Sequence, residues 1–141
     1  MFKKIAIVLI SLLLFSMKVS AAESIHVEIF HINQESVVKR TPLTSKIQRE
    51  AENYIKGITG VYAKFNPIPN SGYMIKIPFE TPAMIKNQWI NAFVDEIIVI
   101  FPEQEDPYLL VFDNKDRTIF LSFKGNTDLL LKHLKFKLNT S

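Results

Sequence analysis

The N-terminal segment sets how much of this chain is free to fold into a domain. Two lysines near the start precede a strongly apolar stretch, residues 5–17, and the small residues Ser20, Ala21 and Ala22 follow it. A positive start, an apolar core and a small-residue exit are the parts of a cleavable secretory signal peptide. The apolar stretch is about 13 residues long, whereas a helix needs roughly 20 to cross a bilayer. We therefore predict that residues 1–21 are removed, with cleavage after Ala22 as the alternative, and that no permanent membrane span remains.

Removing this segment changes the charge of the chain. Lys3, Lys4 and Lys18 account for the whole net charge of +3, so the rest of the chain has as many acidic as basic side chains. Binding of nucleic acid depends on a net basic surface or a dense basic stripe, and we predict no nucleic-acid partner. The chain also contains no cysteine, whereas small secreted domains of eukaryotes usually rely on disulfides. The composition is therefore typical of a bacterial exported protein, with residues 22–141 as a single domain.

Apolar periodicity predicts the local structure of the first half of the domain. Alternation from Ser24 to Ile32 indicates a half-buried strand, and a second strand is expected to start at Val37. Ser45 and Gln48 have the spacing of a capping box, and apolar residues then recur at helical intervals as far as Ile58. We expect further strands at residues 61–65, 73–79, 96–101, 108–113 and 118–123, and a short final helix from Asn126 or Thr127 to Leu134. Pro78 within the strand 73–79 predicts an edge position or a strand end.

Residues 82–94 are ambiguous between helix and strand. Thr81 and Pro82 resemble a cap and first helical residue, and Ile85, Trp89 and Phe93 then recur every four residues, which predicts a second helix. Strand remains the alternative, because the asparagines here are mediocre helix formers. The non-alternating apolar run Ile97 to Ile100 indicates a central strand covered on both faces. Together these elements predict an α+β fold, a curved antiparallel sheet with one or two helices packed on one face.

Carboxylates are the most abundant chemical groups, and half of those in the domain lie between Asp95 and Asp116. Asp95 with Glu96, or Glu103 with Glu105, could serve a hydrolase if two of them converged in a concave pocket. The acidic turn 103–106 lies between two prolines and is typical of a solvated turn. The calcium-loop pattern is missing, and His26 and His31 point to opposite faces of a strand. We therefore predict no catalytic residue, no metal site and no cofactor.

The loop from Asn66 to Gly72 is the best candidate for a binding site. Its two prolines pre-order the backbone, and a rigid exposed loop loses little entropy when it binds a partner. Tyrosines flank the loop, and aromatic side chains are favoured at the centres of interfaces. The predicted binding residues are Tyr62, Asn66, Pro67, Pro69 and Tyr73.

Two resemblances to known proteins bear on this interpretation. The signal segment, the lack of cysteine and the run from Asp95 to Pro102 resemble small uncharacterised secreted proteins of Gram-positive, Bacillus-like bacteria. Over Ser45 to Phe79, a helix followed by antiparallel strands is also similar to the cystatin-like and PepSY-type arrangements of exported inhibitory or chaperone modules. These resemblances imply an extracellular binding role and assign no functional residue.

Three functions are compatible with these observations. The first, which we favour, is a non-enzymatic exported module that binds an extracellular protein or a cell-envelope component. The second is a small secreted carboxylate-dependent hydrolase, and the third is a structural envelope component that self-associates through its strand edges. The sequence contains no thiol nucleophile, no glycine-rich phosphate loop and no His-Glu-x-x-His pair, so no recognised catalytic motif supports an enzyme.

Overall fold

Strands dominate the structure, a computed structural model that describes residues 25–63 and 67–139. In chain order the elements are β1 (His26–His31), β2 (Ser36–Pro42), α2 (Ser45–Lys56), β3 (Ile58–Val61), β4 (Gly72–Lys86), β5 (Asn91–Pro102), β6 (Tyr108–Phe112), β7 (Thr118–Phe123) and α3 (Thr127–Leu134). Strands make up 49% and helices 18% of the described residues. The predicted α+β class is therefore wrong, because this is a sheet-dominated fold with two short helices. The predicted signal peptide lies outside the described residues.

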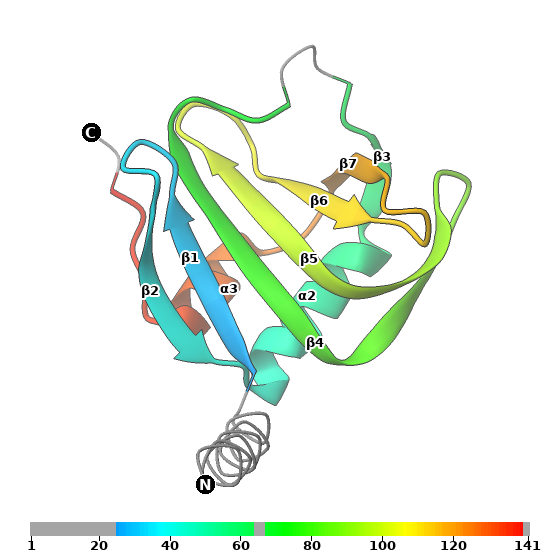
Figure 1. The fold of residues 1–141 in the computed structure, drawn as a ribbon, viewed down its shortest axis with the longest axis horizontal. Coiled ribbons are helices and arrows are strands. Elements are labelled where there is room, and N and C mark those ends of the chain that lie inside the picture. Colours follow the sequence, from blue (N-terminus) through cyan, green and yellow to red (C-terminus); the bar gives the residue numbers. More distant parts are fainter. Residues whose placement is uncertain (1–24, 64–66, 140–141) are drawn as a thin grey trace, which may run out of the picture.

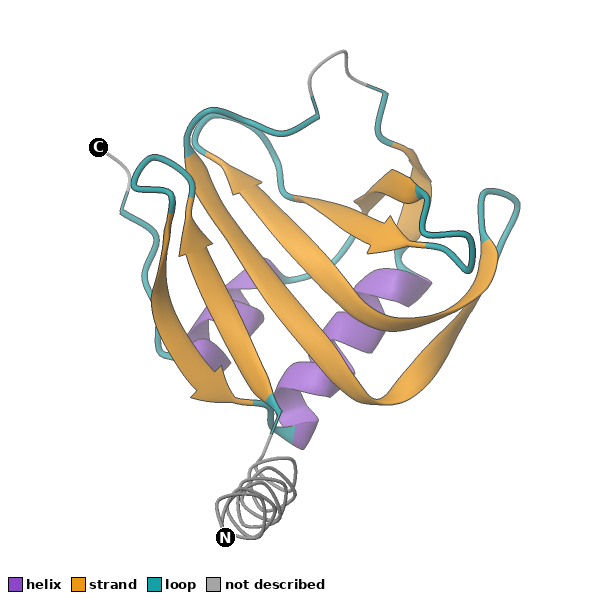
Figure 2. Cartoon of the chain, in the orientation of Figure 1, coloured by secondary structure: helices purple, strands orange, loops and turns teal. Residues whose placement is uncertain are grey.

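All seven strands belong to one antiparallel sheet with the order β2-β1-β4-β5-β6-β7-β3. The sheet curls strongly, and both helices lie against the same hollow side of it (Figures 1 and 2). β3 comes early in the chain, but its only partner in the sheet is the late strand β7. The segment from β3 to β4 must therefore return from one edge of the sheet to its middle. Neither of the described helices has the length and apolar character that a membrane span requires.

The main core fills the space between the hollow face of the sheet and the helices. The helices contribute Ile47, Ala51, Tyr54, Ile55, Leu130 and Leu134, and the strands contribute mainly Val27, Ile29, Ile75, Ile77, Ile97, Val99, Leu109, Val111 and Leu121. Both described cores use only residues between Val27 and Leu138. Residues 22–141 thus contain a complete hydrophobic core of their own.

The two middle strands confirm the expected burial pattern. Alternate residues of β4 from Tyr73 to Phe79 are buried, as the period-2 pattern predicts. In β5, Ile97 and Val99 belong to the main core, whereas Ile100 is buried on the opposite face with Tyr108 and Leu110. The prediction that this strand is central and covered on both faces is confirmed.

Pro78 does not lie at an edge or at a strand end, so that prediction is wrong. It sits within β4, a strand paired on both sides, at the place where regular pairing stops. Pairing with β1 ends at Lys76, and the register with β5 shifts between Pro78 and Ala83. A proline lacks the N–H that a regular ladder uses, and an irregularity is where a sheet accommodates it.

The predicted second helix over residues 82–94 is also wrong. These residues form the far part of a long hairpin, in which β4 continues to Lys86 and β5 begins at Asn91. The turn is organised by Asn87, whose Oδ1 atom accepts hydrogen bonds from the backbone N–H groups of Trp89 and Ile90, each at 2.9 Å. An asparagine that bonds the backbone two or three residues on favours a turn over a helix.

Both expected helices at the other positions are confirmed, with a shifted cap on the first. The N-cap of α2 is Thr44, whose Oγ1 atom accepts a hydrogen bond from the N–H of Ile47 at 3.2 Å, so Ser45 is already helical. Gln48 does not complete a capping box, because its side chain bonds Glu52 and the backbone N–H of Glu80. At the start of α3, the Asn126 side chain caps the helix.

The C-terminal end of α2 is held against the segment that leads into α3. The carbonyl of Gly57 accepts a hydrogen bond from the N–H of Lys124 at 2.8 Å, and the Tyr54 hydroxyl donates to the carbonyl of Asn126 at 2.9 Å. A Cβ atom on Gly57 would lie 2.1 Å from the Lys124 carbonyl oxygen, so only glycine permits this approach. Burial, together with the charges of nearby carboxylates, raises the pKa of Tyr54, so its hydroxyl stays protonated as a donor.

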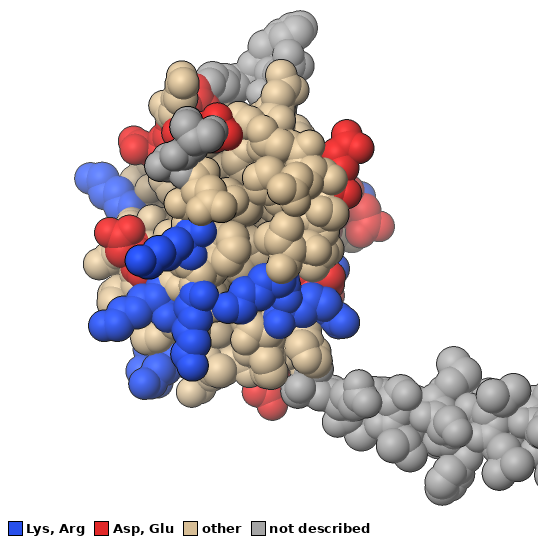
Figure 3. Space-filling model, turned by 90° about the vertical axis from the view of Figure 1, so that its left-hand side faces the viewer, with Lys and Arg blue, Asp and Glu red and all other residues tan. Residues whose placement is uncertain are grey.

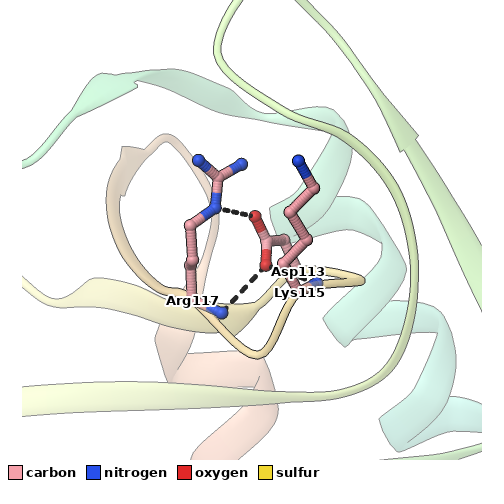
Figure 4. A network of polar contacts seen from close by, with 3 residues as sticks. All are labelled: Asp113, Lys115 and Arg117. Atoms are coloured by element: carbon pink, nitrogen blue, oxygen red, sulfur yellow. Dashed lines mark hydrogen bonds and ion pairs between the residues drawn. The ribbon is translucent and has the colours of Figure 1, made fainter.

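A single carboxylate organises the turn between β6 and β7 (Figure 4). Asp113 accepts hydrogen bonds from the backbone N–H groups of Lys115 and Arg117, each at 2.9 Å, and from the Arg117 Nε atom at 2.6 Å. The Asp113 side chain is only 6% exposed. Partial desolvation raises its pKa, but the bonds and charge of Arg117 and the bond from Lys115 lower it by more, so the net effect is a lowered pKa.

Candidate functional site

Two loops meet at one end of the sheet. The connection from β3 to β4 returns to the middle of the sheet beside the loop that joins β5 to β6 (Figure 1). The predicted strand 61–65 is shorter and earlier than expected, since β3 ends at Val61, and Phe65 lies outside the described residues. Tyr62 is therefore the first residue of the connection. Loops that project from a rigid sheet are the usual places for binding residues.

A pair of stacked tyrosines joins the two loops. The rings of Tyr62 and Tyr108 lie parallel, with centroids 3.8 Å apart and planes 9° apart. The Tyr62 hydroxyl donates a hydrogen bond to Glu105 Oε2 at 2.9 Å, and the Tyr108 hydroxyl donates to the carbonyl of Pro67. Burial and the neighbouring Tyr62 raise the pKa of Tyr108 to about 12, so this hydroxyl remains a donor at neutral pH. The stack thus fixes the relative positions of both loops.

The four residues Glu103, Gln104, Glu105 and Asp106, here called the acidic loop, separate two depressions in the surface. All four are exposed. On one side is a hollow of about 800 Å³, which they line together with Tyr62, Tyr108 and Ser122. On another side, Glu103 and Glu105 line a crevice of about 180 Å³ that reaches Asp128 at the start of α3. The acidic loop is therefore a ridge of negative charge with space for a ligand on either side.

The predicted binding residues divide between this site and the core. Tyr62 and Pro67 are joined through Tyr108, and Pro69 lines a third hollow of about 390 Å³ with residues of the acidic loop. Tyr73 is only 5% exposed and its ring packs edge-on against His31 and Phe136, but it also lines the 180 Å³ crevice with Glu103 and Glu105. Asn66 falls outside the described residues. The structure therefore brings Tyr62, Pro67 and Pro69 to the same end of the sheet, and it places Tyr73, largely buried, in the wall of the crevice beside the acidic loop.

Sequence reasoning named Glu103 and Glu105 only as candidate carboxylates of a hydrolase, and it did not connect the acidic loop or Tyr108 with Tyr62 and Pro67. It interpreted the acidic turn as solvated, and the turn is exposed, but its neighbours come from the distant Tyr62 and Pro67. One available signal was Tyr108 itself. A large aromatic directly after Pro107 at the start of a strand is well placed to support a loop that crosses nearby.

The candidate carboxylate pairs differ in what they could do. Asp95 is exposed on β5, and Glu96 lies 3.7 Å from the Lys76 ammonium, with its Oε2 atom buried and without a hydrogen bond. Glu103 and Glu105, by contrast, line the same hollow. Within residues 25–63 and 67–139, no group of three or more histidines and carboxylates is placed to hold a metal ion. The acidic loop is therefore the part of the described chain with the most concentrated chemistry.

Comparison of the chain with protein-family models, curated proteins and solved structures finds no match. The resemblances noted in the sequence stay predictions, and function must be argued from the site.

Proposed function

We propose that this chain is a non-enzymatic exported module that binds a positively charged segment of an extracellular protein or envelope component. The observation that carries the proposal is the acidic loop beside the 800 Å³ hollow. Glu103 and Asp106 line this hollow beside Glu105, which accepts the hydrogen bond from Tyr62, and the described lining residues include no lysine or arginine. A partner that supplies cations would complement them, and complementary charges favour both encounter and correct orientation.

The stacked tyrosines supply the second requirement of a binding site, which is rigidity. Tyr62 and Tyr108 fix the edge of the hollow through a ring stack and two hydrogen bonds. A preorganised surface loses little conformational entropy when a partner docks. Tyrosine also offers an apolar ring and a polar hydroxyl in the same place, and lysine or arginine side chains pack on such rings.

Charge reversal on the acidic loop tests the proposal. Glu103→Lys/Asp106→Lys removes two carboxylates from the hollow and keeps the bond between Tyr62 and Glu105. Exposed ion pairs contribute about 0.2–1 kcal/mol each, so we expect the loss of two pairs to weaken binding of a fluorescent hexalysine peptide about 2- to 30-fold, and repulsion by the new lysines weakens it further. Fluorescence anisotropy at low salt measures this with residues 22–141.

The matched control is the double variant Asp95→Lys/Asp116→Lys. It makes the same change in net charge at two positions outside the hollow. Equal weakening in both variants would mean that net charge alone attracts the peptide, and the site would be wrong.

Crosslinking with the same pair of variants in culture medium and envelope extract then identifies the natural partner. A protein or envelope component captured by the control but not by the acidic-loop variant supports the proposal.

A hydrolase is the second candidate, because Glu103 and Glu105 line one hollow, as a carboxylate-dependent enzyme would require. Glu103→Gln and Glu105→Gln distinguish the two functions. A hydrolase loses turnover of a glycoside substrate with either change. A binding module shows no turnover of this substrate even in the unchanged protein.

A structural envelope component, the third function, would self-associate. Sedimentation of residues 22–141 across a concentration series checks this. Association that persists in the absence of any other partner would favour the structural role over the binding module.

A further inference from the structure

A second charged surface lies on the side of the molecule that carries β2 and α3. Figure 3 shows lysine and arginine side chains gathered in a band across this side, with acidic side chains mostly around it. On β2 and at the end of α3, Lys39 contacts Lys135, and Lys135 lines one groove with Lys132 and Lys137. We call these four residues the basic face. The chain from residue 22 on is neutral, so this concentration of positive charge is local.

A direct contact links the two parts of the basic face. The Lys39 ammonium donates a hydrogen bond to the carbonyl oxygen of Lys135 at 2.9 Å, across 96 residues of sequence. Lys135 ends α3 in the left-handed conformation, with φ of 52°. The bond satisfies a carbonyl at the helix terminus, where partial negative charge accumulates. It therefore holds β2 and the end of α3 in one surface.

Three of these lysines, Lys132, Lys135 and Lys137, line a shallow groove of about 820 Å³. Its apolar lining comes from Leu131, Phe136 and Leu138, which are only partly exposed because they pack against the main core. Phe136 is fixed further by an edge-on contact with Tyr73, with ring centroids 5.2 Å apart. The groove thus combines apolar residues held by the core with three exposed lysines. Asp128 is its one acidic lining residue, and it lies toward the acidic loop.

We propose that this groove binds a linear polymer that carries phosphate groups and no bases. Three lysines that line one open groove can meet several anions of one chain, and lysine binds phosphate as a point charge without a fixed fork geometry. The acidic loop beyond Asp128 repels the same polymer, so it is held at the lysine end. The proposal concerns a different surface from the acidic hollow and does not depend on the proposed function.

The side chains of this face argue against two other anionic partners. A bilayer surface is bound by helices that insert large exposed apolar side chains, whereas Phe136 and Leu138 are packed against the core. The exposed apolar residues on β2 and α3 are Val37, Val38 and Leu129, and none of the three lines the groove. Single-stranded nucleic acid is bound by stacking bases on exposed aromatic rings, and the groove's one aromatic ring, Phe136, is engaged with Tyr73.

The experiment measures binding of long-chain inorganic polyphosphate to residues 22–141 over a series of salt concentrations. Each lysine that neutralises a phosphate contributes roughly −0.7 to the slope of log K against log salt, so we expect a slope of about −2 to −3. Lys132→Gln/Lys137→Gln removes two cations from the rim and leaves the Lys39–Lys135 bond in place. We expect about a 25-fold loss of affinity, or fivefold per cation, and a slope shallower by about 1.4.

The matched control is Lys86→Gln/Lys124→Gln, which makes the same change in net charge at two exposed lysines outside the groove. The proposal predicts nearly unchanged affinity and slope for this control. Circular dichroism and thermal melting establish that both variants are folded. Equal losses of affinity for polyphosphate in the two variants would overturn the proposal. So would a failure of the parent protein to bind polyphosphate at 50 mM salt.

Two further probes separate the sources of phosphate. A single-stranded oligonucleotide and vesicles containing phosphatidylglycerol are titrated at matched phosphate concentration. Weaker binding of both than of polyphosphate supports the proposal. Tighter binding of either probe would assign the basic face to nucleic acid or to a membrane surface, and the base-free polymer would be wrong.

Discussion

Asp113 illustrates how much of a turn can depend on one side chain. Its carboxylate receives three hydrogen bonds from Lys115 and Arg117, two at 2.9 Å from backbone N–H groups and one at 2.6 Å from the Arg117 Nε atom. The same residue was weighed in the sequence only as one of many acidic groups. Its role is to organise the polypeptide backbone, so it is unavailable as a ligand for a metal ion.

The lowered pKa of Asp113 predicts how its contribution to stability depends on pH. A carboxylate with a lowered pKa in the folded state stabilises the fold above its unfolded pKa, near 3.9, and this stabilisation is lost as the pH falls through the folded pKa. Asp113→Asn should therefore lower the melting temperature at pH 7. The difference from the parent protein should shrink below about pH 4.

Asp116→Asn is the control, because it removes a charge from the same turn but none of the three hydrogen bonds. Its melting temperature should stay close to that of the parent at every pH. A pH-independent difference for Asp113→Asn would show that the carboxylate's charge contributes nothing to the turn.

At the scale of elements, the contact between α2 and the segment before α3 depends on Gly57. Gly57→Ala would place a Cβ atom 2.1 Å from the Lys124 carbonyl oxygen, so the backbone has to move. We expect a loss of about 1–3 kcal/mol in the free energy of unfolding, measured by urea denaturation.

Gly60→Ala provides a close comparison, because the nearest atom to a Cβ there is a Trp89 side-chain carbon at 3.9 Å. This change should leave stability the same or raise it by up to about 1 kcal/mol, since alanine restricts the unfolded chain. Similar losses at both positions would mean that glycine is needed for backbone freedom and not for close approach.

Elements defined by local signals could be predicted from the sequence. The helix α2, the strands β6 and β7 and the capped helix α3 follow from periodicity and from capping residues near in the chain. The segment 82–94 could not be predicted this way, because its four-residue spacing is compatible with a helix. Pairing along the β4–β5 hairpin outweighs that weak local preference.

The candidate site shows the same division between local and distant information. Tyr62, Pro67 and Pro69 were found from loop composition, which is a local property. The acidic loop was not connected to them, because the connection depends on the stack of Tyr62 on Tyr108. That stack exists only because β3 pairs at the far edge of the sheet. The fold class failed for a related reason, since the sheet gains the far parts of β4 and β5, residues 82–86 and 91–94, from a segment that has helical spacing.

For the molecule as a whole, the predicted signal peptide determines the mass that the secreted chain should have. Expressed with its own N-terminus in a host that secretes proteins, the chain released into the medium should begin at Ala22, or at Glu23 if cleavage follows Ala22. Intact-mass spectrometry distinguishes these products. A chain that keeps its first 21 residues, or that stays inside the cell, would contradict the predicted signal peptide.

The edge position of β3 has a consequence for the order in which the fold can be completed. β3 is synthesised before residue 62, but its partner β7 is completed only at Phe123. While residues 62–123 of a growing or translocating chain emerge, β3 therefore has no partner strand. The sheet is completed only when nearly all of the domain has emerged. A chain that ended after β6 would leave the backbone of β3 without its partner strand and open to pairing with another molecule.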